Sequence, residues 1–354
     1  MRALLRALLA LLLALLLAVG GYVGYVLLDY ERIEDNLALT VKGAPTDALS
    51  VGVSYTALTY NIGFGAYTPD FSFFMDGGTE SRAASRESVL ATTRGAIDLA
   101  AAEEADFYLF QEVDVDADRS YHIDQVAMLR EGFSSHASVF ALNYHSAYLM
   151  YPLDRPHGAS ESGLLTLSRY TPTSAVRRSL PISTSLTKLL DLDRAYTVSR
   201  VPVEGGRELV IYNVHTSAYG GSPEIRTAQL TMLLSDMKRE YDAGNYCLAG
   251  GDFNHDFTGD STILFGGSEA NYGWAQPFPA DLLPEGIRRA LDYEGDPTPS
   301  CRNCDVPYSP DCMTLIVDGF LVSDNIEVTA VKNLSSGFAY SDHEPVRLEF
   351  VLLP

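Results

Sequence analysis

Short β-type segments, interrupted by only two long helical patterns, recur along the chain after residue 50. These segments are rich in β-branched and aromatic residues and span 51–65, 106–114, 162–170, 195–205, 207–220, 246–254, 313–323 and 344–353. Apolar residues at helical spacing predict one helix over 85–105 and another that begins after the N-cap Ser222 and ends near Tyr241. The Gly205-Gly206 turn predicts a hairpin. This irregular alternation predicts an α/β fold with mixed β-sheets and outer helices, and 354 residues allow one large domain.

The N-terminus contains 22 residues without a charge, from Ala7 to Leu28. This stretch can cross a hydrocarbon core of about 30 Å and is long for a cleaved signal sequence. Arg2 and Arg6 precede it and acidic residues follow it, so the N-terminus is expected in the cytoplasm and the body outside. We expect a transmembrane signal anchor at 1–28, a polar linker at 29–50 and one domain at 51–354, in a single-pass protein of the cell membrane. The alternative is a secreted protein that is cleaved near "LAVGG".

The formal net charge of the chain is −21, and residues 1–50 contribute only −1 of it. A body at −20 repels polyanions at long range, although salt limits the reach to about 8 Å. It has no basic stripe of the kind that marks a dedicated DNA-binding protein. We therefore expect no tight nucleic-acid partner, and a monomer.

Four cysteines are compatible with an oxidising compartment. Cys247 lies in an apolar run and is expected to be a buried thiol. Cys301, Cys304 and Cys312 crowd into "CRNCDVPYSPDC". A disulfide that closes this loop is the favoured interpretation, with its pairing unassigned, and part of a zinc site is the alternative.

Polar side chains stand at the C-terminal ends of several segments that should be buried. They are Asn61, Glu112, His215 and the pair Asp252 and Asn254, which point the same way on an extended chain. Strand ends next to a core are where binding sites collect. Carboxylate and amide oxygens suit a hard cation such as Mg²⁺, and imidazole suits proton transfer or charge neutralisation.

Asp318 lies in "LIVDGFLV", where an unpaired carboxylate would cost several kcal/mol. "YSDHEPV" offers Asp342 and His343 as partners just before the last strand. An Asp–His hydrogen bond fixes the tautomer of the ring and raises its basicity. We expect Asp318 and His343 to form the reactive pair, with Asp342 free to reach a metal.

The blocks "TYNIG", "FQEVD", "NVHTSAY", "GGDFN", "IVDGFLVS" and "YSDHEPV" occur in the order and approximate spacing of the endonuclease/exonuclease/phosphatase superfamily. The sequence resembles this group over about residues 51–353. The group includes abasic-site endonucleases, pancreatic-type deoxyribonucleases, neutral sphingomyelinases and inositol polyphosphate 5-phosphatases. The resemblance implies a four-layered α/β sandwich, with two mixed β-sheets packed face to face and helices on the outer faces. It also implies Mg²⁺-dependent hydrolysis of phosphoesters, with Mn²⁺ as an alternative ion.

The resemblance also implies roles for individual residues. Glu112 resembles the main metal ligand of the family, and Asn61 and Asp342 resemble groups near the metal. The catalytic positions are matched by His215, Asp252, Asn254, Asp318 and His343. Asp252 and Asn254 correspond to residues that hold the attacking water and a phosphoryl oxygen, and Asp318 to the residue that orients the imidazole of His343. Arg194 resembles a substrate-binding arginine ahead of the histidine strand.

The sequence favours an exported, membrane-anchored hydrolase that acts on a lipid head group or another small phosphoester. An extracellular nuclease is the first alternative, and a non-catalytic binding module is the second. Residues 63–78, 114–125 and 258–312 are expected to wall the pocket. Arg82, Arg86 and Arg119 lie in or near these segments, where solvated surface arginines are favoured over ligands for an anionic group.

Overall fold

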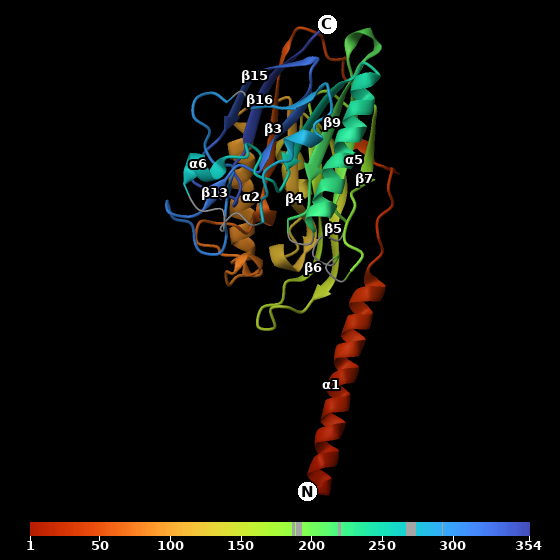
Figure 1. Cartoon of the computed structure of the whole chain (residues 1–354), viewed down its shortest axis with the longest axis vertical. Coiled ribbons are helices and arrows are strands. Elements are labelled where there is room, and N and C mark those ends of the chain that lie inside the picture. The colour runs from red at the N-terminus through yellow and green to blue at the C-terminus, as the bar shows by residue number, and fades with distance from the viewer. Residues whose placement is uncertain (186–187, 189–192, 219–220, 267–273, 292) are drawn as a thin grey trace.

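The computed structural model describes residues 1–185, 188, 193–218, 221–266, 274–291 and 293–354. Helix α1 (Arg2–Asp29) leaves one end of the body as a separate rod (Figure 1). It is long and apolar enough to cross a membrane by length and composition, and nearly all of its residues are exposed.

The body is built on two seven-stranded sheets. The first sheet has the order β15 (Ile326–Asn333), β16 (Val346–Leu352), β3 (Ser54–Asn61), β4 (Phe107–Ala117), β6 (Gly158–Ser168), β5 (Ala137–Leu149) and β2 (Val41–Lys42). The second sheet has the order β1 (Leu37–Ala38), β7 (Ser174–Ser179), β8 (Ala195–Pro202), β9 (Glu208–His215), β10 (Tyr246–Asp252), β14 (Asp318–Ser323) and β11 (Ile287–Arg289). Both sheets are mixed, because β3 pairs parallel with β4 and β9 pairs parallel with β10. A separate ribbon joins β12 (Cys301–Arg302) to β13 (Thr314–Leu315).

Helices cover the outer faces of both sheets. Helices α2 (Arg86–Ala101) and α3 (Gln125–Gly132) pack on the first sheet, and α5 (Pro223–Asp242) packs on the second (Figure 1). The Ser222 hydroxyl accepts a hydrogen bond from the Ile225 amide, which confirms the predicted N-cap. The remaining helical segments are short: α6 (Ser261–Phe265) and the 3-10 turns Gly63–Gly65, Phe74–Asp76, Asp118–Ser120, Glu204–Gly206 and Ala280–Leu282. The predicted four-layered α/β sandwich is therefore confirmed.

Several elements differ from the expectation. Strands β5, β7 and β15 were not predicted, because their apolar positions are interrupted by polar residues such as Asn143 and Arg177. The predicted linker at 29–50 contains β1, which pairs with β7, and β2, which pairs with β5. It therefore adds one short strand to the edge of each sheet.

The inner faces of the strands change from apolar to polar along the sandwich. On β9, Leu209 and Ile211 belong to the core between the sheets, Asn213 joins a buried hydrogen-bond network, and His215 ends the strand. The same order occurs on β3 (Tyr55, Ala57, Thr59, Asn61) and, read backwards, on β14 (Val322, Phe320, Asp318). Because side chains alternate with a period of two, each strand delivers a polar residue to the same end of the sandwich.

Candidate active site

The polar strand ends meet at one edge of the two sheets. Asp252 at the end of β10 is directly opposite His215 at the end of β9 and Asp318 at the start of β14. The Asn61 amide at the end of β3 donates a hydrogen bond across the sandwich to Asp252 Oδ2 at 3.1 Å. Residues far apart in the sequence therefore form one buried cluster.

Two glycines before Asp252 allow the strands to approach closely. A Cβ atom on Gly250 would lie 2.5 Å from the ring of Phe320, and one on Gly251 would lie 1.9 Å from the Val214 carbonyl oxygen. A larger residue at either position would push β10 away from its neighbours. The "GG" of the "GGDFN" block is thus required by packing beside the site.

Glu112 reaches the pocket through a local distortion of β4. The alternation along β4 points Gln111 inward, and its amide donates a hydrogen bond to Asn213 Oδ1 at 2.8 Å. Glu112 has a φ of +52°, and the pairing with β6 shifts its register between Phe110 and Val113. A positive φ is unfavourable for a residue with a side chain. This distortion lets Glu112 line the pocket although it follows an inward-facing residue.

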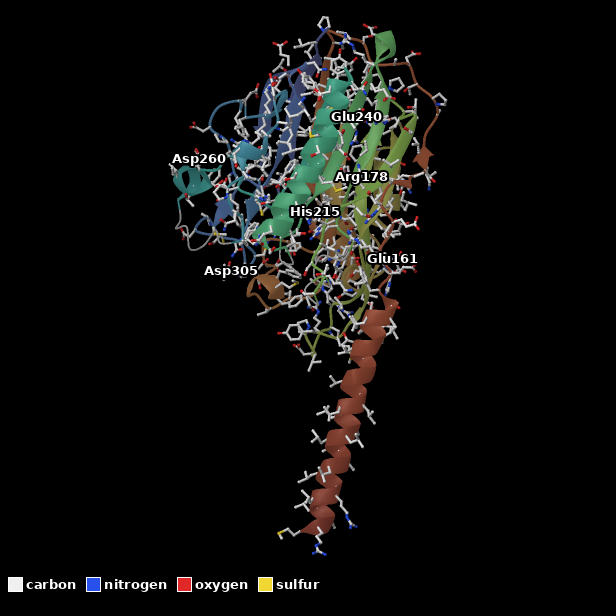
Figure 2. The ribbon with its side chains drawn as sticks, turned by 45° about the vertical axis from the view of Figure 1, so that its right-hand side comes forward. Glu161, Arg178, His215, Glu240, Asp260 and Asp305 are labelled. Carbon is white, nitrogen blue, oxygen red and sulfur yellow. The ribbon has the colours of Figure 1, made fainter. Side chains whose placement is uncertain are left out.

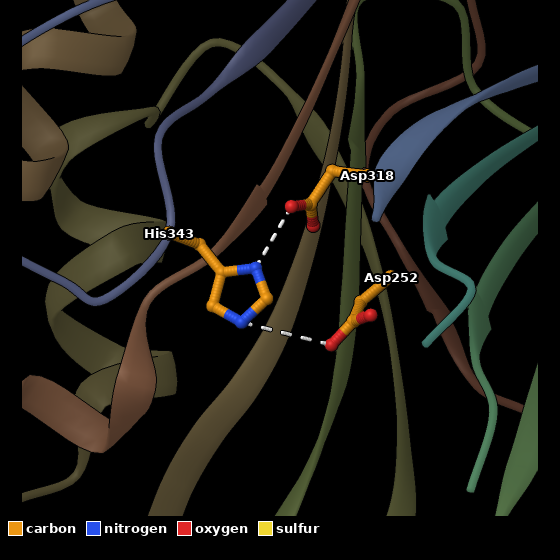
Figure 3. Close-up of side chains that lie close together, drawn as sticks. All are labelled: Asp252, Asp318 and His343. Carbon is orange, nitrogen blue, oxygen red and sulfur yellow. Dashed lines mark hydrogen bonds and ion pairs between the residues drawn. The ribbon is translucent and has the colours of Figure 1, made fainter. Parts of the chain in front are cut away.

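Asp318 and His343 form the expected pair. Asp318 Oδ2 accepts a hydrogen bond from His343 Nδ1 at 2.8 Å (Figure 3) and another from the Ser300 hydroxyl, also at 2.8 Å. Burial opposes the charged imidazole, but the adjacent Asp318 carboxylate, with other acidic groups nearby, raises the pKa of His343 well above its usual value. The Asp318 bond leaves His343 Nε2 on the side of Asp252, 3.8 Å from Asp252 Oδ2 (Figure 3).

Asp252 is the centre of the cluster. Its Oδ1 accepts a hydrogen bond from the backbone N–H of Asn254 at 2.9 Å, and its Oδ2 lies 3.4 Å from His215 Nε2. Burial raises the pKa of Asp252 to about 7, against the opposing effect of His343. A carboxylate with this pKa can hold or accept a proton near neutral pH.

His215 differs electrostatically from His343. It is buried beside Arg194, and burial together with that positive charge lowers the pKa of His215 well below its usual value. The ring is therefore neutral, and its Nδ1 has no hydrogen-bond partner among the described residues. The cluster thus combines a charged and a neutral imidazole.

The two asparagines are held by the backbone. Asn61 Oδ1 accepts from the Gly63 amide at 3.0 Å, which turns its nitrogen toward Asp252 and Glu112. Asn254 has a φ of +48°, and its side-chain nitrogen donates to the Thr216 carbonyl at 3.0 Å. Both side chains are fixed at the edge of the cluster.

The cysteine interpretation was wrong. All four cysteines are free thiols, and Cys247 is buried as expected. Cys301 Sγ lies 3.7 Å from His343 Nε2, while Cys304 Sγ donates to Asp342 Oδ2 at 3.7 Å. These two sulfurs point into the site instead of toward each other, and Cys312 Sγ accepts from the Ser309 amide. The described residues contain no metal-type cluster that includes these thiols.

Arg119 is a pocket residue that sequence reasoning placed on the surface. Its guanidinium donates to both oxygens of Asp114, at 2.8 and 3.1 Å, and lies 3.9 Å from the centroid of the Phe64 ring. It is buried, as is Arg194, and both line the pocket. Arg86 is exposed, and Arg82 donates to the Pro156 carbonyl. Only the length of "DVDADRS" after a site strand could have indicated Arg119.

The three loop segments expected to wall the pocket do so. Their contributions to the lining are Phe64, Tyr67, Phe73, Met75, Asp76, Arg119, Trp274, Cys301, Arg302 and Asn303. Of the predicted site residues, Glu112, Arg194, His215, Asp252, Asn254, Asp342 and His343 line the same pocket. Asn61 and Asp318 lie behind it and contact Asp252 and His343. The individual roles of these residues remain predictions.

The acidic groups fit a divalent cation. Glu112 and Asp342 both line the pocket, and burial, together with the nearby charge of Asp342, raises the pKa of Glu112. A cation between them would remove this repulsion. Asp252, Asp318 and His343 also each place one ligand atom within 4.8 Å of the others. Because Asp318 and His343 already share a hydrogen bond, the pair Glu112 and Asp342 fits the ion better.

Comparison with known proteins agrees with this site. A model described as the "Endonuclease/Exonuclease/phosphatase family" matches residues 58–343, which contain every predicted site residue. No match was found among the sequences of curated proteins.

Solved structures of the same class share the fold. A Beutenbergia cavernae endonuclease/exonuclease/phosphatase superposes with a TM-score of 0.56 at 22% identity, over 85% of this chain and 72% of that one. A family protein from Leptotrichia buccalis gives 0.55 at 13% identity, over 84% and 99%. ANGEL2, a 2′,3′-cyclic phosphatase, gives 0.54 at 14% identity, over 91% and 99%.

Proposed function

The chain belongs to the endonuclease/exonuclease/phosphatase family, a family of phosphoester hydrolases, and we propose that it is a membrane-anchored, exported member that requires a divalent metal. The observation that carries this proposal is the convergence of Glu112, Asp252 and His343 in one pocket. In-line attack of water on phosphorus needs a group that takes a proton, a charged hydrogen-bond donor and acidic groups that hold a cation. The pocket offers a carboxylate with a raised pKa, a charged imidazole and a pair of acidic groups that repel each other.

The side chains divide the chemistry among them. Asp252 holds the attacking water and, with a pKa of about 7, takes its proton. His343, kept charged by Asp318, donates a hydrogen bond from Nε2 to a phosphoryl oxygen as negative charge grows there. Neutral His215 and the cation Arg194 add donors on the other side of Asp252. A Mg²⁺ ion held by Glu112 and Asp342 would neutralise the phosphoryl group and lower the pKa of bound water.

The proposed substrate is a small or lipid phosphoester. The body carries −20 of the net charge of −21 of the chain, which repels a long polyanion. Aromatic side chains from residues 63–78 close the pocket on one side. Both features favour a compact phosphoester over a nucleic-acid strand.

The proposed location follows from α1. Its apolar run is preceded by Arg2 and Arg6 and followed by acidic residues, which favours a cytoplasmic N-terminus and an exported body. Protease added to intact cells should degrade the body and spare a short N-terminal fragment in the membrane fraction. A body found only in the medium would support signal cleavage, and a protected body would contradict export.

The activity is tested with the full chain in lipid nanodiscs. The substrates are bis(p-nitrophenyl) phosphate, p-nitrophenyl phosphate, phospholipid vesicles and plasmid DNA, each with Mg²⁺ or Mn²⁺ and with EDTA. We expect hydrolysis of a small or lipid phosphoester that EDTA abolishes and that the isosteric Asp252→Asn variant lowers by about 10³-fold.

Two other results would overturn this proposal. Rapid nicking of plasmid at low protein concentration would identify the chain as a nuclease. If no phosphoester were hydrolysed and Glu112→Ala changed nothing, the chain would be a non-catalytic binding module on the same scaffold.

A further inference from the structure

The tip of the β5–β6 hairpin exposes a cluster of apolar side chains. Within residues 148–156, Tyr148, Met150, Tyr151 and Leu153 are 38%, 45%, 70% and 80% exposed. The other large exposed apolar residues in the described part of the body form no group of this size, and at most two of them, Ile263 and Leu264 on α6, share an element. A contiguous exposed apolar patch on a soluble body marks a contact surface.

This tip is attached to α1. The Tyr22 hydroxyl donates to the Tyr148 carbonyl at 3.1 Å and accepts from the Met150 amide at 2.9 Å. The Tyr25 hydroxyl accepts from the Tyr148 amide at 3.2 Å. In Figure 1 the hairpin projects from the end of the body at which α1 leaves it.

The contact fixes the hairpin at the depth of the membrane interface. Tyr22 lies six residues before Leu28, the last residue of the charge-free run, which is about 9 Å along a helix. If the run spans the hydrocarbon core, Tyr22 lies about 9 Å and Tyr25 about 4.5 Å inside its outer end, a depth that interfacial segments also reach, and the hairpin atoms bonded to them lie at that level. The backbone groups of Tyr148 and Met150 are then satisfied by tyrosine hydroxyls, as a poorly hydrated environment requires.

The charge of the tip and of its surroundings indicates which phospholipid head groups the tip can contact. Residues 148–156 carry one acidic and one basic residue, Asp154 and Arg155, and the Arg155 side chain is turned inward to the Ala83 carbonyl. Acidic residues, including Asp29, Asp116 and Glu161, gather beside the end of α1 (Figure 2 labels Glu161). A zwitterionic surface fits this neutral tip, whereas an anionic one would be repelled.

The same hairpin borders the pocket. The Tyr151 ring lies 5.8 Å from the Phe74 ring, and Phe74 in turn lies 6.0 Å from the His157 ring. His157 and Phe73 both line the pocket. A membrane at the tip would therefore lie beside the aromatic wall of the active site.

We propose that residues 148–156 are a membrane-contact surface that holds the pocket of the anchored chain against zwitterionic phospholipid head groups. The inference rests on the proposed anchoring by α1. It narrows the proposed substrate to a phosphoester that is presented by the bilayer in which the chain is embedded.

The test uses single tryptophan reporters, since Trp274 is the only native tryptophan. In a Trp274→Phe background, the full chain carries Tyr151→Trp at the tip, Leu13→Trp in α1, or Ile263→Trp on α6 as a matched exposed control. Each variant is reconstituted in phosphatidylcholine vesicles with or without brominated acyl chains, which quench tryptophan on contact. We expect Tyr151→Trp and Leu13→Trp to lose most of their fluorescence and Ile263→Trp to keep it.

The outcomes separate the two proposals. If the fluorescence of Leu13→Trp is quenched and that of Tyr151→Trp is not, the proposed hairpin contact is wrong and the anchor stands. Loss of quenching at Leu13→Trp would overturn the anchor, and the hairpin proposal with it.

A kinetic test uses the full chain with Met150 and Leu153 changed together to serine. We expect a several-fold higher KM for a phospholipid substrate in the vesicle and an unchanged rate on soluble bis(p-nitrophenyl) phosphate. An unchanged KM for the phospholipid would contradict a role for the tip in presenting substrate.

Discussion

Two regions between the sheets share the same strands and differ in chemistry. Far from the pocket, β9 and β14 contribute Ile211 and Phe320 to a fully apolar core. Nearer the pocket, the same inner faces contribute Asn213 and Asp318, which are equally buried. Apolar burial stabilises the first region directly, whereas each polar group of the second must find a partner to avoid a cost of about 1–3 kcal/mol. The comparison shows that apolar burial stabilises one end of the sandwich, whereas hydrogen bonds between polar side chains set the geometry of the other end.

Hydrogen bonds made by side chains of the polar region link the two sheets. Asn213 on β9 donates to the carbonyls of Phe110 and Leu165 on the first sheet and accepts from Gln111. Thr59 on β3 contacts Gln111 as well. Hydrogen bonds are directional, so this network fixes the register of β3, β4 and β9 directly beneath Asn61, Glu112 and His215.

The largest difference is predicted between the effects of substituting two inward-facing residues of β14, Asp318 and Phe320. Asp318→Ala removes the acceptor of His343 Nδ1 and of the Ser300 hydroxyl, so it should lower kcat by about 10³-fold and cost about 1–3 kcal/mol of unfolding free energy. Phe320→Ala should lower the free energy of unfolding by about 3–5 kcal/mol and leave the rate per folded molecule near that of the wild type. Urea denaturation and single-turnover hydrolysis measure both. Equal losses of rate in the two variants would abolish the distinction between the regions.

The side chains of Asn213 and Gln111, which link the two sheets, are predicted to depend on each other in their contributions to stability. Asn213→Leu removes one acceptor of Gln111 Nε2, which keeps the Leu109 carbonyl and the Thr59 hydroxyl, and it removes the side-chain donor to the Phe110 and Leu165 carbonyls. It should cost about 1–3 kcal/mol of unfolding free energy. Adding Gln111→Leu should recover at least about 1 kcal/mol, because both partners are then apolar. Equilibrium unfolding of the single and double variants tests this. Strictly additive losses would show that the two side chains do not support each other.

The pocket wall is predicted to weaken in acid. His157 is buried and donates from Nδ1 to the Ser81 carbonyl, and burial, reinforced by the charge of Arg119, lowers the pKa of His157 to about 3. Its unfolded pKa is near 6.5, so between these values the unfolded state binds the proton and stability is lost as the pH falls. At pH 5 the loss should be about 2 kcal/mol, and His157→Phe should remove this part of the pH dependence. A variant that loses stability from pH 7 to pH 5 as the wild type does would contradict this assignment.

The smallest effects are predicted for the thiols. Cys301→Ala should change kcat several-fold through the contact with His343, while Cys312→Ala should change neither rate nor melting temperature. A reducing agent should leave the melting temperature of the wild type unchanged, because the thiols are free. Destabilisation by the reductant would restore the disulfide interpretation.

The sequence was informative where a regular strand ends in a polar residue. Polar residues at the ends of buried strands predicted a binding site, and the structure brings Asn61, His215 and Asp252 together at one end of the sandwich. Glu112 was found as a polar residue at the end of a buried run and through its sequence block. The strand β4 continues to Ala117, however, and the φ of +52° that brings Glu112 to the pocket after the inward-facing Gln111 has no signal of its own.

Other features depended on tertiary contacts. Arg119 resembles a surface arginine until Asp114 and the Phe64 ring enclose it. Cys301 and Cys304 belong to a cysteine cluster that resembles a disulfide loop, until their contacts place Cys301 Sγ beside His343 and Cys304 Sγ beside Asp342. Apart from the Asp114–Arg119 pair, which is five residues apart, these contacts join segments far apart in the chain, so spacing along the sequence could not reveal them.

The central claim is that these strand ends form one centre that binds a divalent cation for phosphoester hydrolysis. Titration of the full chain with Mn²⁺, followed by electron paramagnetic resonance, tests it directly. We predict one tightly bound ion per chain, at least about tenfold weaker binding by Glu112→Gln, and wild-type binding by the surface control Glu161→Gln. Identical Mn²⁺ binding by wild type and Glu112→Gln, together with hydrolysis that persists in EDTA, would contradict the account.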